Sequence, residues 1–311
     1  MMSKMENRVI LGDVREVAQT LPEDFFQAII TSPPYFGHRN YSESRTPNEI
    51  GRESDARYYI ENVIGLFRDL RSKLKSDGLF WLNLGDTYRG KSLLGIPWRV
   101  ALGLQDDGWI LRSDIIWYKP NAMPSSIKDR PTIDHEYIFL FAKNQEYYYN
   151  ADAIREPHVT FTEKSRMRGG RNHFGKVGGT PEGGKNGGNN NLHDGRWDQA
   201  FHPKGRNKRT VWEIPLGKFR EAHFAVYPEK LVETCIFAST KEGDFVLDPF
   251  TGSGTTGVVA CRLSRRFVGV ELISKYQRMA QKRIDDVNSQ LGFFSSLSPS
   301  QIGLSSTLKP I

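Results

Sequence analysis

The segment Thr31-Ser-Pro-Pro-Tyr35 has a residue pattern suited to holding a planar amine. Its prolines fix φ and lack N–H groups, so the segment presents two acceptors, the Ser32 hydroxyl and the Pro33 carbonyl, on a rigid rim. An exocyclic NH₂ group can donate its two protons to these acceptors, and the Tyr35 ring offers a flat face for stacking on a base. Such acceptors favour a tetrahedral nitrogen that attacks a sulfonium methyl group in line. A proline-rich turn that only caps a strand is the alternative.

A second segment, Asp248-Pro-Phe-Thr-Gly-Ser-Gly-Thr-Thr256, follows an apolar strand pattern and opens a helix pattern. Glycines at such a turn let the backbone approach a ligand, and the helix start offers free N–H groups. Glu271 ends the next predicted strand, where an acid can bind a pair of ribose hydroxyls. A plain glycine-rich turn is the alternative, but the order of strand, turn, helix, strand and acid favours a site for a nucleotide-like cofactor.

Strand and helix patterns alternate around both segments, and they predict a mostly parallel, twisted sheet with helices on both faces, an α/β fold. The helix before residue 79 is expected to end at Asp77-Gly78. Strands are expected over residues 8–11, 26–31, 79–84, 113–118, 136–142, 245–247 and 267–270, and helices over residues 14–21, 58–74, 97–105, 228–239, 257–264 and 273–287.

The bulk composition narrows the class of protein. With 311 residues, 38% of them hydrophobic, the chain can form one large α/β domain or a core domain with an insertion. Cys235 and Cys261 lie far apart, and their spacing suggests neither a disulfide framework nor a metal site. The sequence shows no signal peptide and no apolar run of about 18 residues, so a cytoplasmic protein is predicted.

The positive charge of the chain belongs to one segment. Arg155–Glu221 contains 14 Lys and Arg against 7 Asp and Glu, a surplus equal to the net charge of +7 for the whole chain. Within it, Ser165–Gly195 holds ten glycines and cannot bury enough apolar surface to fold alone. The segment is therefore expected to be an exposed insertion that contacts a polyanion, with a solvated loop as the alternative.

At these residues the chain resembles the permuted amino-methyltransferases of restriction–modification systems, the β group of DNA methyltransferases. In that family the target-base motif precedes the cofactor motif, as Ser32–Tyr35 precedes Asp248–Thr256 here. The resemblance covers residues 7–287 apart from the basic segment. Gly12-Asp13 and Leu79–Asp86 match further family motifs, and His223–Pro228 resembles the family segment at the methionine end of the cofactor, although Phe224 replaces a usual proline.

The resemblance implies a circularly permuted, Rossmann-like methyltransferase fold that uses S-adenosylmethionine and acts on double-stranded DNA. It places catalysis on a flipped base at Ser32, Pro33, Pro34 and Tyr35. The implied cofactor-binding residues are Asp13, Thr31, Ala225, Asp248, Phe250, Gly252, Gly254, Thr255 and Glu271. Candidate DNA-binding residues are Arg39, in the loop after Tyr35, and the basic residues Arg166, Arg168, Arg171, Arg196, Lys204, Arg206, Lys208 and Arg209.

The target atom follows from the same resemblance. SPPY is more often associated with N4-cytosine enzymes and DPPY with N6-adenine enzymes, so N4 of cytosine is favoured and N6 of adenine stays open. An RNA or protein-glutamine amino-methyltransferase, or a DNA-binding module that has lost catalysis, are the remaining alternatives.

The predicted organisation is a catalytic domain over residues 7–149 and 222–288, a basic target-recognition insertion over 150–221, and a disordered tail over 289–311. A cognate restriction endonuclease and a location at the nucleoid would fit this family.

Overall fold

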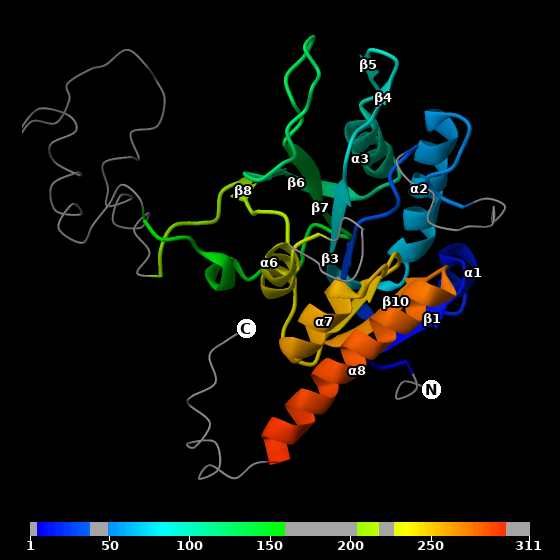
Figure 1. The fold of residues 1–311 in the computed structure, drawn as a ribbon. Coiled ribbons are helices and arrows are strands. Elements are labelled where there is room, and N and C mark those ends of the chain that lie inside the picture. Colours follow the sequence, from blue (N-terminus) through cyan, green and yellow to red (C-terminus); the bar gives the residue numbers. More distant parts are fainter. Residues whose placement is uncertain (1–4, 38–48, 159–203, 218–226, 297–311) are drawn as a thin grey trace, which may run out of the picture. The chain divides into compact units, whose positions relative to one another are not determined.

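The computed structural model describes residues 5–37, 49–158, 204–217 and 227–296. Contacts between residues divide the chain into a first unit, Met1–Tyr149 with Thr210–Ile311, and a second unit, Asn150–Arg209. The first unit contains the α/β sheet (Figure 1). The second unit ends at Arg209 rather than at residue 221, because the strand Val211–Glu213 pairs with the main sheet instead of continuing the insertion.

Eight strands form the main sheet in the order β1-β10-β9-β2-β3-β7-β6-β8. Strand β7 runs antiparallel to both of its neighbours, β3 and β6, and every other pair is parallel. The predicted mostly parallel sheet is therefore confirmed. The bounds are β1 (Arg8–Leu11), β2 (Phe26–Thr31), β3 (Leu74–Leu84), β6 (Ile110–Tyr118), β7 (His135–Ala142), β8 (Val211–Glu213), β9 (Phe245–Asp248) and β10 (Arg266–Glu271), with a separate hairpin of β4 (Tyr88–Arg89) and β5 (Ser92–Leu93).

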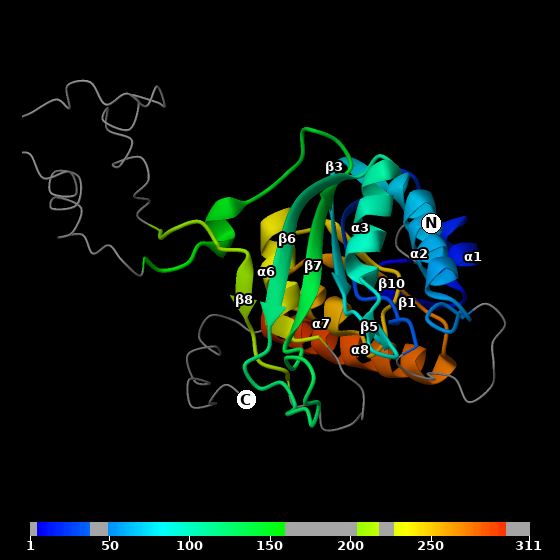
Figure 2. The ribbon, with the colours of Figure 1, turned by 90° about the horizontal axis from the view of Figure 1, so that it is seen from above.

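Helices cover both faces of the sheet, as Figure 2 shows. The central strand β3 illustrates the two layers, because successive side chains of a strand point to opposite faces. Phe80 packs against Phe67 of one layer with ring centroids 4.4 Å apart, whereas Trp81 donates its Nε1–H to Ser239 Oγ of the other layer at 3.3 Å. One layer holds α1 (Val14–Ala18), α2 (Ala56–Arg71) and α3 (Ile96–Asp106), and the other holds α6 (Glu229–Ser239), α7 (Thr255–Arg262) and α8 (Ser274–Ser296).

Several element ends differ from the predictions, and the ends of α2 and α8 differ for identifiable reasons. Helix α2 ends at Arg71 instead of Leu74, and Asp77-Gly78 lies within β3 rather than at the helix end, because the chain has already turned into β3, where Leu74 is buried beside Phe26. Helix α8 continues to Ser296, so the first residues of the predicted disordered tail are helical; no proline interrupts the chain before Pro299. None of the helices in the described ranges combines the length and apolar character needed to cross a bilayer.

The topology gathers the chemical segments at one edge of the sheet. Strands β1, β2, β3, β9 and β10 are parallel and end at this edge, and the antiparallel strand β7 begins there. Strands β2 and β9 are neighbours, so Thr31 and Asp248, which are far apart in sequence, lie side by side. Ligands of open α/β sheets bind outside the carboxyl ends of the strands, so this edge is the place to look for a site.

Candidate functional site

A cavity of about 500 Å³ opens at the carboxyl edge of the sheet, within the first unit. Both chemical segments contribute to its wall, together with the end of β1 and the end of β10. The residues predicted for catalysis or cofactor binding that line this cavity are Asp13, Ser32, Pro33, Pro34, Tyr35, Phe250, Gly252, Thr255 and Glu271. The fold thus brings nine of the predicted site residues around one space.

Asp248 joins the two segments from behind the cavity wall. Its carboxylate is fully buried and accepts hydrogen bonds from Thr31 Oγ1 at 2.6 Å, Phe250 N at 3.0 Å and Thr256 Oγ1 at 2.6 Å, with Tyr227 Oη at 3.3 Å. Burial raises the pKa of this carboxyl above its ordinary value, although the hydrogen bonds oppose the rise. Thr31 and Asp248, both predicted to contact the cofactor, lie behind the wall and hold the two segments together.

Gly254 also lies behind the wall rather than in it. It precedes the first residue of α7 with φ +87°, a conformation that favours glycine, and an added Cβ would come within 2.9 Å of the Cα of Ala280 in α8. Its role in this structure is therefore the close packing of α7 on α8. The remaining predicted residues Ala225, Arg39, Arg166, Arg168, Arg171 and Arg196 lie outside the described residues.

Two carboxylates flank the glycine turn. Glu271 accepts hydrogen bonds from the backbone N–H groups of Gly252 and Ile273, each at 2.9 Å, and burial raises its pKa to about 7. Asp13 caps α1 and pairs with the Arg15 guanidinium, whose hydrogen bond lowers the pKa of the Asp13 carboxyl. Of these two groups, the Asp13 carboxyl has a lowered pKa and the Glu271 carboxyl has a pKa raised to about 7.

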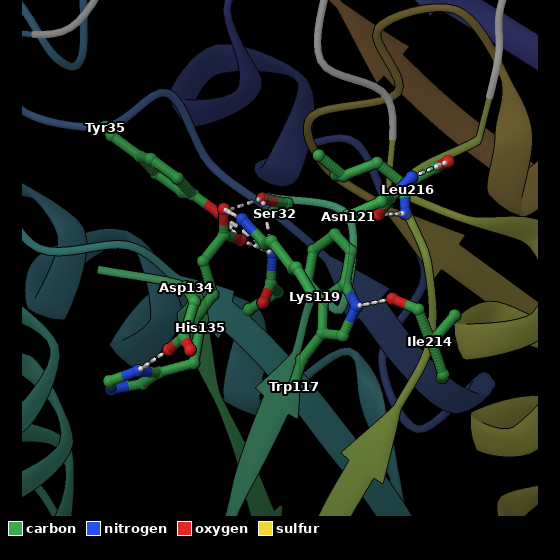
Figure 3. A network of polar contacts seen from close by, with 11 residues as sticks. Ser32, Tyr35, Trp117, Lys119, Asn121, Asp134, His135, Ile214 and Leu216 are labelled. Atoms are coloured by element: carbon green, nitrogen blue, oxygen red, sulfur yellow. Dashed lines mark hydrogen bonds and ion pairs between the residues drawn. The ribbon is translucent and has the colours of Figure 1, made fainter. Parts of the chain in front are cut away.

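Ser32 belongs to a polar network that ends in an ion pair (Figure 3). Ser32 Oγ donates to Tyr35 Oη at 3.2 Å, and Tyr35 Oη donates to Glu136 Oε2 at 2.5 Å. Asn83 Nδ2 lies 2.8 Å from Tyr35 Oη, 2.8 Å from Glu136 Oε2 and 3.2 Å from Ser32 Oγ. The ammonium group of Lys119 pairs with the other Glu136 oxygen. All five side chains line the cavity, so the network forms one of its polar walls.

Asn83, Lys119, Glu136 and Tyr227 were not predicted as site residues. Asn83 is a buried polar residue within the apolar strand pattern LFWLNL, and this contrast is a signal that the sequence does contain. Lys119 and Glu136 stand at strand ends, where charged residues are common, so only the pairing of β6 with β7 distinguishes them. The role of Tyr227, a bond to Asp248 and Thr256, follows from contacts between distant segments.

The Tyr35 ring packs directly on the backbone of Gly85. A Cβ built at Gly85 would stand 2.6 Å from Tyr35 Cε2 and 2.9 Å from Cδ2, closer than carbon atoms can approach. Burial and the Glu136 carboxylate raise the pKa of Tyr35 well above its ordinary value, so the hydroxyl keeps its proton. The glycine and the carboxylate together fix where this ring and its hydroxyl lie.

Replacing Gly85 by alanine is expected to push the Tyr35 ring away and to lower the free energy of unfolding by roughly 1–3 kcal/mol, as overpacking does. Urea unfolding followed by circular dichroism measures the change. Gly65 in α2 is the matched control, since nothing lies within 4 Å of its added Cβ, and Gly65→Ala should be neutral or slightly stabilising. Equal stability of the Gly85→Ala protein and the parent would contradict the packing argument.

Four of the predicted DNA-binding residues, Lys204, Arg206, Lys208 and Arg209, are described in the second unit. Arg206 and Glu156 exchange backbone hydrogen bonds at 2.8 and 2.9 Å, and their side chains form an ion pair at 3.2 Å. Lys208 lies 3.4 Å from the same carboxylate, and Lys204 lies 3.5 Å from Asp152. Part of the positive charge of this unit is thus balanced by carboxylates within it.

The chain matches a protein-family model described as "DNA methylase" over residues 26–282. It is 38% identical to the Type II methyltransferase M.SmaI of Serratia marcescens over 306 residues, which covers 89% of this chain and 90% of that protein. It is also 38% identical to the Type II methyltransferase M.Cfr9I of Citrobacter freundii, over 89% of this chain and 88% of that protein. The similarity spans both chemical segments and the strands between them.

Solved structures with lower sequence identity to this chain have the same fold. The PvuII DNA methyltransferase, described as cytosine-N4-specific, superposes with a TM-score of 0.63 at 20% identity and covers 92% of this chain and 95% of its own. The complex of M1.HpyAVI with SAM superposes with a TM-score of 0.53 at 21% identity, over 89% of this chain and 98% of its own. These neighbours share the Rossmann-like sheet with helices on both faces.

Proposed function

The chain belongs to the DNA methylase family of N6- and N4-methyltransferases, and on that premise we propose that it methylates N4 of a cytosine flipped out of duplex DNA, with S-adenosylmethionine as the methyl donor. The observation that carries the proposal is the position of Ser32 and Pro33 in the wall of the cavity that the glycine turn also lines. The two residues border a cavity of about 500 Å³, which we propose holds the base beside the cofactor. The cytosine-N4 description of the PvuII neighbour supports the same target atom.

The cavity fits S-adenosylmethionine in the chemistry of its lining. Glu271 offers a carboxylate for ribose hydroxyls, and Phe250 offers an apolar face for the adenine. Thr255 Oγ1 is buried in the wall with no hydrogen-bond partner among the residues that the structure describes, so a polar ligand atom could satisfy it. Gly252 and Asp13 complete the set of residues that would hold the cofactor, which supplies an electrophilic methyl group on sulfur when bound.

The residues of the chain orient the attacking nitrogen. Ser32 Oγ and the Pro33 carbonyl accept the two protons of the amino group, which localises the nitrogen lone pair and directs it toward the cofactor side of the cavity. Pro34 keeps this rim rigid, and its carbonyl is held by the Tyr59 hydroxyl at 2.9 Å. The ring of Tyr35 borders the same space and limits where the flipped base can lie.

The second unit is proposed to read the DNA sequence. Its surplus of Lys and Arg suits binding to phosphates, and the ion pairs of Lys204 and Arg206 would order the described part of the unit. A cognate restriction endonuclease and residence on cellular DNA belong to the same proposal, because the relatives at 38% identity are Type II methyltransferases.

The proposal is tested by incubating the protein with labelled S-adenosylmethionine and mixed-sequence duplex DNA. The DNA is then digested to nucleosides, and the labelled nucleoside is identified by mass spectrometry. N4-methylcytosine is the expected product. N6-methyladenine would leave the reaction type in place but overturn the proposed target atom. With either product, sequencing of the modified DNA would give the recognition site. If RNA or protein became labelled while DNA containing every candidate recognition sequence did not, DNA would be excluded as the substrate.

The affinity for S-adenosylmethionine is expected to rise with pH up to about 7 and to level off above it. The pKa of Glu271 is raised to about 7, so below that pH the carboxyl is protonated, and hydroxyl donors prefer the ionised form. The limiting slope is about tenfold in Kd per pH unit. The raised pKa of Glu271 also affects the stability of the ligand-free protein. Its contribution to the free energy of unfolding is fully present below pH 4.5, the ordinary pKa, and is lost as the pH rises to about 7.

Isothermal titration calorimetry from pH 5.5 to 8.5 measures this pH dependence. The Glu271→Gln protein should bind S-adenosylmethionine more weakly, and its Kd should not change with pH around 7, because the amide does not titrate. A wild-type affinity that is independent of pH would exclude Glu271 as the group that binds the ribose.

A further inference from the structure

The ion pair of Glu136 with Lys119 lies at the end of the network that contains Ser32, and it takes no part in the proposed contacts with the amine or the cofactor. Both side chains are only 15% exposed, so the carboxylate has left water and depends on its partners. Lys119 supplies the compensating charge and also lies 4.5 Å from the Trp117 ring. Trp117 is itself held by its Nε1–H bond to the Ile214 carbonyl at 2.8 Å (Figure 3).

A paired carboxylate only accepts hydrogen bonds, and this sets the direction of every bond in the network. Tyr35 must use its single proton on Glu136 Oε2, 2.5 Å away, so its oxygen can only accept from the remaining neighbours. Ser32 then donates its proton to Tyr35. Asn83 must likewise turn its amide nitrogen, not its oxygen, toward Glu136 and Ser32. The hydroxyl protons of Tyr35 and Ser32 are thereby both used inside the network.

The consequence reaches the cavity through Ser32. A hydroxyl has one proton to donate and two lone pairs. The two protons of Asn83 Nδ2 are shared among Tyr35 Oη and Glu136 Oε2, each 2.8 Å away, and Ser32 Oγ at 3.2 Å. With its proton on Tyr35, Ser32 has only acceptor lone pairs left for a ligand. Such a hydroxyl attracts an amino group and repels a carbonyl oxygen.

We propose that Glu136 is a positioning residue that forces Ser32 to act only as an acceptor, and that the site thereby selects a 4-amino pyrimidine over a 4-oxo pyrimidine. Lys119 keeps Glu136 in place for this task. The inference rests on the proposed function, since it explains how a serine, which could donate or accept, recognises the target amine of cytosine. In this proposal Glu136 acts on the amine through Tyr35 and Ser32 rather than by direct contact.

The variant Glu136→Gln tests the proposal, because a glutamine amide can donate to Tyr35 and so reverse the chain of hydrogen bonds. We expect kcat to fall roughly 10- to 100-fold, the range for a lost hydrogen bond to a charged group, with little change in the affinity for S-adenosylmethionine. Glu229→Gln, which breaks an exposed ion pair with Arg262 on the surface, is the matched control and should leave kcat unchanged.

The deciding measurement is base preference in binding, which does not depend on turnover. Duplexes containing the mapped site would carry cytosine or uracil at the target position, each opposite an abasic site so that base pairing does not differ, with S-adenosylhomocysteine present. Wild-type protein should prefer cytosine by about tenfold or more, and the preference of Glu136→Gln should fall toward unity. A lower kcat with an unchanged preference would show that Glu136 only supports the fold, and would overturn the proposal.

The second variant, Tyr35→Phe, removes the hydroxyl that connects Ser32 with Glu136 but keeps the ring packed on Gly85. This variant should lose the preference for cytosine. Adding Glu136→Gln should reduce the preference little further, because both changes interrupt the same series of hydrogen bonds. Full additivity of the two losses would overturn the proposal. If Glu136→Gln failed to fold, an unchanged preference of Tyr35→Phe for cytosine would overturn it. Absence of N4-methylcytosine with wild-type protein would instead refute the proposed function.

Discussion

Replacing Ser32 by alanine is expected to lower kcat for DNA methylation about 10²- to 10³-fold, the cost of removing one preorganised polar contact at a reacting centre. The affinity for S-adenosylmethionine should stay close to that of the parent protein. Ser32 lines the cavity but makes its polar contacts with Asn83 and Tyr35, away from the glycine turn that would hold the cofactor. The loss should therefore fall on the chemical step.

The size of this effect follows from how tightly Ser32 is held. The Ser32 hydroxyl is aligned by two side chains whose own positions are set by Glu136 and Gly85. A preorganised acceptor does not have to reorient as charge develops on the amine, and water that enters in its place is less well ordered. Alanine also leaves Asn83 Nδ2 with one acceptor fewer, but its bonds to Tyr35 and Glu136 persist, so the fold should survive.

Single-turnover kinetics with the mapped duplex, alongside calorimetric titration of the cofactor, separates the two effects. Ser72→Ala is a suitable control, since this exposed serine ends α2 and does not line the cavity. A Ser32→Ala protein that turns over at the parental rate would remove Ser32 from the chemistry and, with it, the argument for cytosine N4.

Replacing Asp248 by alanine is expected to lower the free energy of unfolding by roughly 3–5 kcal/mol, the range for breaking a buried hydrogen-bonded network. The carboxylate is fully buried and accepts from Thr31, Phe250 and Thr256, which belong to two segments more than 200 residues apart. Its removal takes away an acceptor that all three donors share, and in the fully buried position of Asp248 water does not replace it. It also releases Thr31, the residue before Ser32, so activity should fall with stability.

Urea unfolding measures the loss, and Asp129→Ala provides the contrast. Asp129 is an exposed carboxylate that lies 3.1 Å from Lys91, and surface pairs of this kind contribute about 1 kcal/mol or less. If Asp248→Ala unfolded at the same urea concentration as the parent, the carboxylate would not be the anchor between the two segments.

Much of the fold and part of the site could be read from local pattern. Helix α3 begins with a proline in its first turn as predicted, and the strands of residues 8–11 and 26–31 have the expected bounds. The cavity residues Ser32 and Gly252 were identifiable because proline pairs and glycine turns restrict backbone geometry within a few residues. The parallel sheet followed from the alternation of strands and helices, which permits few other topologies.

Features that depend on distant contacts could not be predicted in this way. Tyr35 and Glu136 are 101 residues apart, and Asn83 and Glu136 are 53 apart; they meet because β7 runs antiparallel beside β3. The sequence around Glu136 resembles any charged strand end, since hydrogen-bond partners supplied by other strands leave no local trace. For the same reason the hydrogen bond between Thr31 and Asp248 could not be predicted, since it depends on the pairing of β2 with β9. Short-range stereochemistry specifies which segments can do chemistry, and the packing of strands far apart in the chain specifies which of their side chains reach the cavity.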